Sequence, residues 1–221
     1  MSNNKIISIL VLGGTGKTGR LVVEQALKKG LHVTALARHP EKFKELRNQP
    51  NLEILRGDVL HYPDVYNAVQ GNDAVISALG RDGKNVEVLT RGTANVIRAI
   101  SQSSVKKLIC LSSIGAGSTK KLSGWKLRAM IWIAGLRQSF DAKAEQEILL
   151  YQSTVDFTLI MAGTLKDGLK TQQTQSFLTQ EAPCFKGMPP KINRLSVAAF
   201  MIELLSIHQW KRKTICVIAK K

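Results

Sequence analysis

Apolar blocks alternate with amphipathic blocks along the chain, and this pattern predicts strands and helices in turn. The first block, Ile6–Leu12, is apolar at every position except Ser8, which is typical of a strand buried on both faces of a parallel sheet. The next block, Thr18–Lys29, has apolar residues at helical spacing and is followed by Gly30, a common residue type just past a helix end. The chain therefore opens with a strand, a turn and a helix.

The same alternation continues to the last residues. We expect further strands at His32–Ala37, Leu52–Arg56, Ala74–Leu79, Lys107–Leu111, Asp156–Met161, Thr214–Ala219 and, briefly, near Gln175–Thr179. We expect further helices at Glu41–Arg47, Tyr62–Val69, Val86–Ser101, Gly124–Leu136, Ser139–Tyr151 and Ser196–Ile207. Such alternation indicates right-handed βαβ crossovers. We therefore predict an α/β fold, a single doubly wound (Rossmann) parallel sheet with helices on both faces, in one domain over residues 1–221.

Composition excludes several classes of protein. Of the 221 residues, 44% are hydrophobic and 22% are charged, as in an ordinary soluble domain. No apolar run approaches the roughly 18 residues of a transmembrane helix, and no secretory signal is visible. The three cysteines are widely spaced and form no cluster with histidine, so we expect neither disulfides nor a metal site. We expect a cytoplasmic protein.

The net charge is the unusual feature of the composition. Lys and Arg number 32 against 16 Asp and Glu, which gives a formal charge of +16. This balance favours anionic partners such as phosphorylated cofactors, nucleic acid or acidic lipid. A generally basic surface with no specific partner explains it equally well. Because no nucleic-acid-binding motif accompanies the charge, we do not expect nucleic-acid binding.

A glycine-rich turn joins the first strand to the first helix. It runs from Gly13 to Gly19 with the spacing G-x-x-G-x-x-G, the middle glycine being Gly16. The first glycine permits a tight turn, the middle one lets a pyrophosphate approach the backbone, and the last lets the helix pack close to the sheet. We predict a dinucleotide site on the free N–H groups of this helix. Its other members are Thr15, Lys17 and Thr18.

Gly16-Lys17-Thr18 also resembles the end of a Walker A loop. That motif requires a glycine where this chain has Val11, inside the predicted strand. A nucleoside-triphosphatase is therefore disfavoured.

The end of the second strand indicates which dinucleotide binds. An NAD site places a carboxylate there for the ribose 2′-hydroxyl. This chain has Arg38, and Glu41 comes only after Pro40. A guanidinium can bind a 2′-phosphate through charge-assisted hydrogen bonds, so we predict NADP(H), with a solvated surface arginine as the alternative. Lys17 and His39 are weaker candidates for the same phosphate.

Several segments together carry a family resemblance. They are Gly13–Gly19, Ala37–Lys42, Gly57–Val59, Asp73–Gly80 and Leu111–Gly115. In this order they resemble the atypical short-chain dehydrogenases, in the NAD(P)H-binding, NmrA-like branch that includes biliverdin reductase B (flavin reductase). The resemblance covers nearly the whole chain and weakens after about residue 164.

The resemblance implies that the carboxyl ends of the strands border the cofactor, as doubly wound sheets do generally. The residues concerned are Asp58 and Val59 at the adenine, Ala78, Leu79 and Gly80 at the nicotinamide ribose, Ser112 and Ser113 at the nicotinamide and substrate, and Met161 and Gly163 near the carboxamide. The stretches at about 115–140 and 164–193 would form the substrate side.

The chain departs from the family at the catalytic acid. Orthodox members use Tyr-x-x-x-Lys, but no lysine follows Tyr62, Tyr66 or Tyr151 at that distance. The corresponding lysine is Lys143, and Ser139 stands four residues before it. Reduction of a planar conjugated acceptor is compatible with this loss, because positioning of the nicotinamide does most of the work there.

We therefore expect an NADPH-dependent reductase of a flavin, biliverdin-like or similar planar acceptor. Its candidate catalytic residues are Ser113, as a hydrogen-bond donor, and Lys143, as a contact to ribose or substrate. The alternative is a non-catalytic NADP(H)-binding regulator or assembly factor. Either could be a monomer or a dimer.

The basic, tryptophan-containing segment at residues 120–137 has two interpretations. It could lie on a membrane surface, or it could cover the substrate side of the cofactor, with Trp125 or Trp132 stacked on a planar substrate. The lid is favoured because Ala129–Leu136 is apolar all round. A dimer contact stays open.

Overall fold

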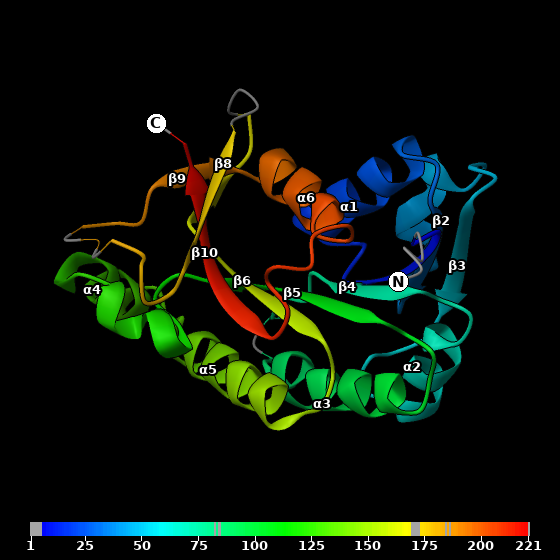
Figure 1. Cartoon of the computed structure of the whole chain (residues 1–221), viewed down its shortest axis with the longest axis horizontal. Helices are drawn as coiled ribbons and strands as arrows, with labels where there is room; N and C mark the ends of the chain where they lie inside the picture. The colour runs from blue at the N-terminus through cyan, green and yellow to red at the C-terminus, as the bar shows by residue number, and fades with distance from the viewer. Residues whose placement is uncertain are drawn as a thin grey trace.

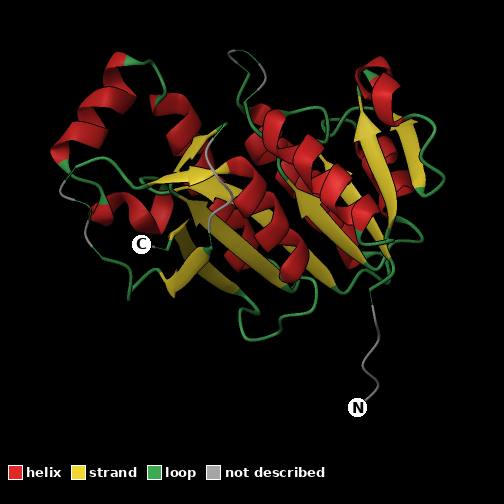
Figure 2. Ribbon diagram, turned by 90° about the horizontal axis from the view of Figure 1, so that it is seen from above, coloured by secondary structure: helices red, strands yellow, loops and turns green. Residues whose placement is uncertain are grey.

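The structure, a computed structural model, describes residues 6–81, 83, 85–168, 173–183, 185 and 187–220. Its centre is an eight-stranded sheet with the order β3-β2-β1-β4-β5-β6-β10-β8 (Figure 1). The strands are β1 (Ser8–Leu12), β2 (His32–Ala37), β3 (Leu52–Arg56), β4 (Ala74–Ser77), β5 (Lys107–Ser113), β6 (Phe157–Ala162), β8 (Thr174–Leu178) and β10 (Lys213–Ala219). All pairings are parallel except that of β8 with β10. Viewed from above, the strands fan out with the usual twist (Figure 2).

Helices cover both faces of this sheet. On one face lie α1 (Lys17–Lys28) and α6 (Arg194–Glu203), and on the other lie α2 (Tyr62–Val69), α3 (Glu87–Ser101) and α5 (Arg137–Gln152) (Figure 1). A further helix, α4 (Trp125–Ile133), lies at the end of the molecule beside α5 (Figure 1). This is the predicted doubly wound Rossmann fold.

The apolar run of β1 shows why a strand here must be hydrophobic on both faces. Ile9 and Val11 pack in the core beneath α1 and α6, whereas Leu10 and Leu12 pack in the core beneath α2, α3 and α5. All four side chains are at most 1% exposed. Because side chains alternate across a strand, burial on both faces demands the unbroken apolar sequence.

Some elements differ from the sequence-based expectation. The expected helix at Glu41–Arg47 is the 3₁₀ helix η1 (Pro40–Leu46), and a second one, η2 (Gly117–Leu122), was not expected. The stretch Thr164–Asn193, expected to be irregular with one strand, also contains β7 (Thr164–Lys166) and β9 (Lys191–Asn193), paired in a small parallel sheet. Three-residue strands are too short to show a period, which is why the pattern missed them.

Within the described part of the chain, every helix is too short or too polar to cross a bilayer.

Candidate functional site

A cavity of about 860 Å³ opens at the carboxyl ends of the parallel strands. Its lining combines the glycine turn, the segments that follow β2, β3 and β4, the end of β5, and single residues of α3, α5, β7 and α6. Most of the residues singled out in the sequence meet here: Gly13, Thr15, Gly16, Lys17, Thr18, Arg38, Asp58, Val59, Ala78, Leu79, Gly80, Ser112, Ser113 and Lys143. Ligands of doubly wound sheets bind at this edge.

The glycine turn has no space for side chains at two of its positions. Gly13 has a φ of +75°, and a Cβ there would lie 2.7 Å from the Ala78 carbonyl oxygen. A Cβ at Gly19 would overlap the Gly13 carbonyl oxygen. Gly19 therefore does not line the cavity but lets α1 pack against the turn. These contacts fix the start of α1 directly beneath the cavity.

The first turn of α1 is prepared for an anion. Its N-cap, Gly16, offers no side-chain hydrogen bond, and the first turn contains no acidic residue. The backbone N–H groups and the helix dipole are thus available to a phosphate. The described lining of the cavity has the same polarity, because it contains six Lys or Arg residues and one acidic residue, Asp58. The six are Lys17, Arg38, Lys42, Arg81, Lys143 and Arg194.

The cationic corner after β2 is formed by Arg38, His39 and Lys42. Glu41 is not part of the cavity lining, and its carboxylate contacts the His39 ring at 3.1 Å. Among the described lining residues, this corner therefore offers no carboxylate that would select a ribose 2′-hydroxyl. It offers instead three groups that can bind a 2′-phosphate.

Two contacts from α1 and the glycine turn hold this corner in position. Arg20 donates to the Lys42 carbonyl oxygen at 2.9 Å and forms an ion pair with Glu45. Phe43 is fully buried, and its ring end would lie 2.9 Å from a Cβ at Gly14. The corner after β2 and the glycine turn therefore form one packed unit.

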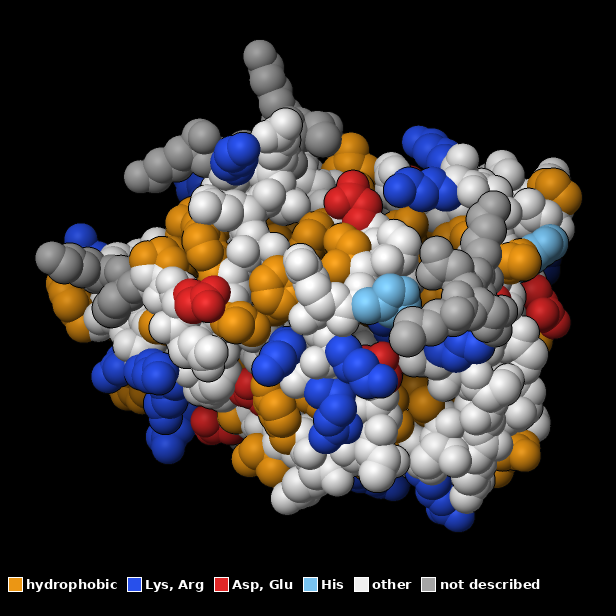
Figure 3. Space-filling model, in the orientation of Figure 1, with side chains coloured by type: hydrophobic (Ala, Val, Ile, Leu, Met, Phe, Trp, Pro, Cys, Tyr) orange, Lys and Arg blue, Asp and Glu red, His pale blue; other side chains and the backbone are white. Residues whose placement is uncertain are grey.

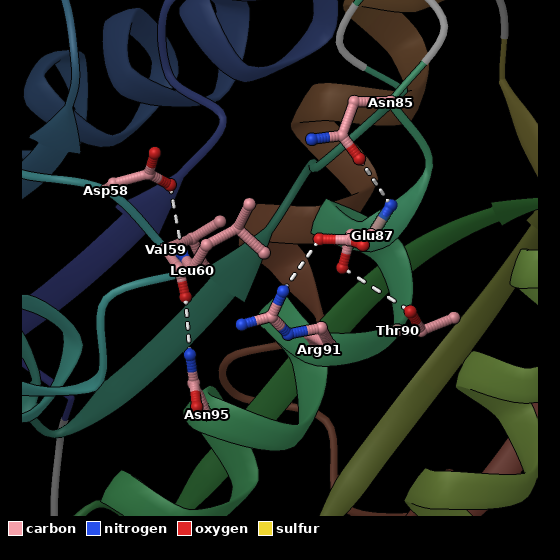
Figure 4. A network of polar contacts seen from close by, with 8 residues as sticks. All are labelled: Asp58, Val59, Leu60, Asn85, Glu87, Thr90, Arg91 and Asn95. Carbon is pink, nitrogen blue, oxygen red and sulfur yellow. Dashed lines mark hydrogen bonds and ion pairs between the residues drawn. The ribbon is translucent and has the colours of Figure 1, made fainter.

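The loop after β3, which carries Asp58 and Val59, is fixed against α3 (Figure 4). The Asp58 carboxylate accepts from the Leu60 amide at 2.9 Å, and the Asn95 side chain donates to the Val59 carbonyl at 2.9 Å. A Cβ at Gly92 of α3 would lie 3.1 Å from Val59. The first turns of α3 are joined by a second polar group, formed by Asn85, Glu87, Thr90 and Arg91. The loop therefore presents a defined edge to the cavity.

At the opposite end of the cavity, Ser112 and Ser113 of β5 lie with Lys143 of α5. Ser112 is only 1% exposed, and its hydroxyl has no hydrogen-bond partner among the described residues. Buried hydroxyls are normally bonded, so this one is poised to bond to a ligand.

Lys143 is the most perturbed base of the site. Burial lowers its pKa from 10.5 to about 8. Burial also raises the pKa of the neighbouring Cys110 thiol to about 12, so that this thiol is neutral and offers no counter-charge at pH 7. No ion pair to Lys143 is present within the described ranges. An ammonium held in this way binds an anionic or electron-rich ligand, or releases a proton, near neutral pH.

No tyrosine takes part in the site. Tyr62, Tyr66 and Tyr151 are all described, and none of them lines the cavity. Ser139, four residues before Lys143, is buried and also lies outside the lining.

An ion-pair bridge that the sequence did not predict joins two of the cations that line the cavity. Asp167, just after β7, accepts from Arg194 at 2.6 Å and from Lys17 at 3.3 Å. These contacts with the two cations lower the pKa of the Asp167 carboxyl group. The bridge joins the first turn of α1 to the first turn of α6.

Several lining residues were not predicted as site residues, among them Lys42, Arg81, Leu165 and Arg194. Lys42 ends one segment that was singled out and Arg81 directly follows another, so both lie close to predicted positions. Leu165 and Arg194 lie in or beside β7 and β9, and only their tertiary contacts bring them here.

Met161 and Gly163 lie outside this lining. Met161 is fully buried in the sheet core, and a Cβ at Gly163 would overlap the Pro190 carbonyl oxygen. Leu165 of β7, which follows Gly163 in the chain, lines the cavity instead.

The expected stacking of Trp125 or Trp132 on a substrate is wrong for this structure. Neither side chain lines the cavity, and they are 70% and 74% exposed. The reason lies in α4, whose apolar residues surround the helix and leave two faces that could be buried. The structure buries the face with Leu127 and exposes the one with the tryptophans.

These features fit a dinucleotide phosphate. The glycine turn packs too tightly at Gly13 and Gly19 for side chains, the buried Ser112 hydroxyl has no hydrogen-bond partner among the described residues, and the excess of cations in the described lining matches a polyanion.

Comparisons with known proteins agree with this geometry. A family model described as NAD(P)H-binding matches residues 13–207. An uncharacterised chloroplastic protein of Arabidopsis thaliana is 30% identical over 98% of this chain and 78% of its own length. The photosystem II assembly factor Ycf39 of Synechocystis is 26% identical over 96% of this chain, which spans only 63% of that protein.

Solved structures share the fold. ChuY, an anaerobillin reductase from Escherichia coli O157:H7, has a TM-score of 0.82 at 22% identity, with 97% of this chain and 98% of its own covered. A short-chain dehydrogenase/reductase of Veillonella parvula, in complex with NADP, has a TM-score of 0.79 at 14% identity, with 97% and 95% covered.

Proposed function

The chain belongs to the NAD(P)H-binding family, and from that premise we propose that it is an NADPH-dependent reductase. Its acceptor would be a flavin, a biliverdin-like compound or another planar conjugated molecule. The observation that carries the proposal is the pairing of a cationic 2′-phosphate corner at one end of the cavity with Ser113 and Lys143 at the other.

The corner of Arg38, His39 and Lys42 supports the choice of NADPH over NADH. Three basic side chains attract a 2′-phosphate, and the described lining of the corner offers no carboxylate for a 2′-hydroxyl. The glycine turn and the first turn of α1 would hold the pyrophosphate, with Lys17 and Arg194, which share the Asp167 carboxylate, as the nearby cations.

The serines and the lysine would act on the acceptor. Bound NADPH supplies the hydride. Ser112 and Ser113 would orient the reacting rings by hydrogen bonds from β5, a rigid strand. With a pKa of about 8, Lys143 is roughly nine-tenths protonated at pH 7.

Lys143 would therefore supply the proton that accompanies the hydride. The overall reaction consumes NADPH, one proton and the acceptor, and gives NADP⁺ and the acceptor carrying two added hydrogens. The proton passes from the Lys143 ammonium to a heteroatom of the acceptor, and solvent restores the ammonium. This replaces the tyrosine acid of orthodox relatives.

The test is NADPH consumption by the purified protein, followed by absorbance, with FMN, biliverdin and a quinone as acceptors and NADH as the comparison. We expect turnover that prefers NADPH. Arg38→Asp should weaken NADPH binding by roughly 10- to 100-fold, the value of a charge-assisted hydrogen bond. Arg47→Asp, the same charge change at an exposed residue outside the cavity, should not. Equal NADPH affinity of the Arg38 and Arg47 variants would contradict the proposal that Arg38 binds the 2′-phosphate.

A second candidate, a non-catalytic NADP(H)-binding assembly factor, is favoured by one observation. The relative from Synechocystis is named as an assembly factor, and the cavity lacks a tyrosine acid. It predicts saturable NADPH binding with no turnover on any of the three acceptors.

A further inference from the structure

The helix α4 is attached to the molecule by little of its surface. Leu127 is its only buried residue. Trp125 is 70% exposed, Trp132 is 74% exposed and Ile133 is 78% exposed. Large apolar side chains rarely gather on the surface of a soluble protein without a partner.

The exposed residues form a continuous face of the helix. Trp132 and Ile133 follow Trp125 by seven and eight residues, a spacing that places all three on one side. Leu127 points to the opposite side, into the protein. Lys126 and Arg128, both exposed, fall on the two flanks of the outward face. An apolar stripe bordered by basic residues is the arrangement of helices that lie in a membrane interface.

Further basic residues lie close to α4 in the sequence. Lys120 and Lys121 of η2 are exposed, and the segment from Lys120 to Arg137 contains no acidic residue. Arg137 is engaged by Asp141 of α5 at 3.7 Å. Figure 3 shows basic and apolar side chains mixed at this end of the molecule, where Figure 1 draws α4. We call Trp125, Trp132, Ile133, Lys120, Lys121, Lys126 and Arg128 together the α4 patch.

We propose that the α4 patch docks the protein onto an anionic lipid surface. The two indole rings and Ile133 would insert at the level of the headgroups, where tryptophan is favoured. The four basic side chains would attract anionic headgroups. The contact is peripheral, and it is independent of whether the protein reduces an acceptor.

A second copy of the chain could also cover the α4 patch, but the charge of the patch disfavours such a dimer. Two α4 patches facing each other would bring like charges together without a carboxylate to separate them. Neither tryptophan reaches the cavity in this structure, so a substrate there does not account for their exposed rings.

Vesicle flotation of the full chain tests the proposal. We expect the protein to float with vesicles containing phosphatidylglycerol and to remain behind with pure phosphatidylcholine, and high salt should release it. At about 1 kcal/mol for each basic residue near the surface, Lys120→Gln/Lys121→Gln/Lys126→Gln should lose roughly a hundredfold in vesicle affinity. Trp125→Ser/Trp132→Ser should also lose affinity at unchanged charge.

The matched control is Lys28→Gln/Lys29→Gln/Lys44→Gln, which removes the same charge from exposed residues at the end of α1 and in η1. It should float like the unchanged protein. Retained NADPH binding confirms that each variant is folded. No flotation, equal losses in both lysine variants, or a dimer that the tryptophan substitutions dissolve would overturn the proposal.

Discussion

Lys143 places a charge where the fold would be more stable without one. Its ammonium lies at the base of the cavity, beside a neutral Cys110 thiol, with no ion pair in the described structure. Replacement by Met keeps the length of the side chain and removes the charge. We therefore expect Lys143→Met to unfold less readily than the unchanged protein at neutral pH, although it loses turnover.

The pKa of Lys143 gives the size of this effect. Its value is about 8 in the folded protein against 10.5 for an ordinary lysine. Each pKa unit corresponds to about 1.4 kcal/mol, so that charging Lys143 costs the folded state about 3 kcal/mol. Between the two pKa values the unfolded chain binds more protons than the folded protein, and stability rises with pH. The penalty is complete below about pH 8 and relieved by about pH 10.5.

Denaturant unfolding of both proteins at pH 7 and at pH 10.5 measures the effect. The advantage of Lys143→Met should be up to about 3 kcal/mol at pH 7 and should shrink by a similar amount at the higher pH. Lys107→Met is the matched control, because this lysine is also buried but donates to the carbonyl oxygens of Leu204 and Ile207 at 2.8 and 2.6 Å. Its loss should destabilise by about 1–3 kcal/mol.

Two outcomes would contradict a destabilising charge on Lys143. One is a Lys143→Met variant less stable than the unchanged protein at pH 7, and the other is a stability difference between them that does not vary with pH. Turnover gives a second readout, since a proton donor with a pKa of about 8 requires kcat to fall as pH rises through that value.

Three further substitutions test other parts of the structure. Gly19→Ala forces a Cβ against the Gly13 carbonyl oxygen, and we expect about 1–3 kcal/mol of destabilisation together with weaker NADPH binding in a fluorescence titration. Asp167→Asn removes an exposed carboxylate that competes with phosphate for Arg194, so NADPH affinity should rise by less than about fivefold; a fall would mean that the bridge instead orders the site. Arg212→Ala deletes three hydrogen bonds to backbone carbonyls near the end of α5, and thermal or denaturant unfolding should show a loss of about 2 kcal/mol or more.

The regular part of the fold could be predicted because each segment carries its own periodicity. Tyr62–Val69 is a helix with the predicted bounds, and His32–Ala37 and Leu52–Arg56 are strands with the predicted bounds. The short strands β7 and β9 could not be predicted, because three residues carry no period and their pairing is set by contacts across 25 residues or more of chain.

The residues of the site fall into the same two groups: those beside regular elements, and those placed by contacts between distant segments. Gly13 and Arg38 were identified because each directly follows a predictable strand, and Ser113 was identified through the family resemblance. Arg194 was not, since it reaches the cavity only through the packing of α6 and β9. The prediction that Trp132 faces the substrate failed for another reason: the sequence of a helix that is apolar all round does not show which side the protein buries.

The place of β10 in the sheet has a consequence for the order in which the chain can fold. Of the eight strands, β10 is made last, yet it lies between β6 and β8. During synthesis the strands from β1 to β6 can assemble in the order in which they emerge, but β8 must wait about 35 residues for its partner. Meanwhile β6, buried at all six of its positions in the finished protein, presents an open apolar edge. Emergence of β10 therefore closes the sheet, and any delay before it leaves the nascent protein most open to aggregation.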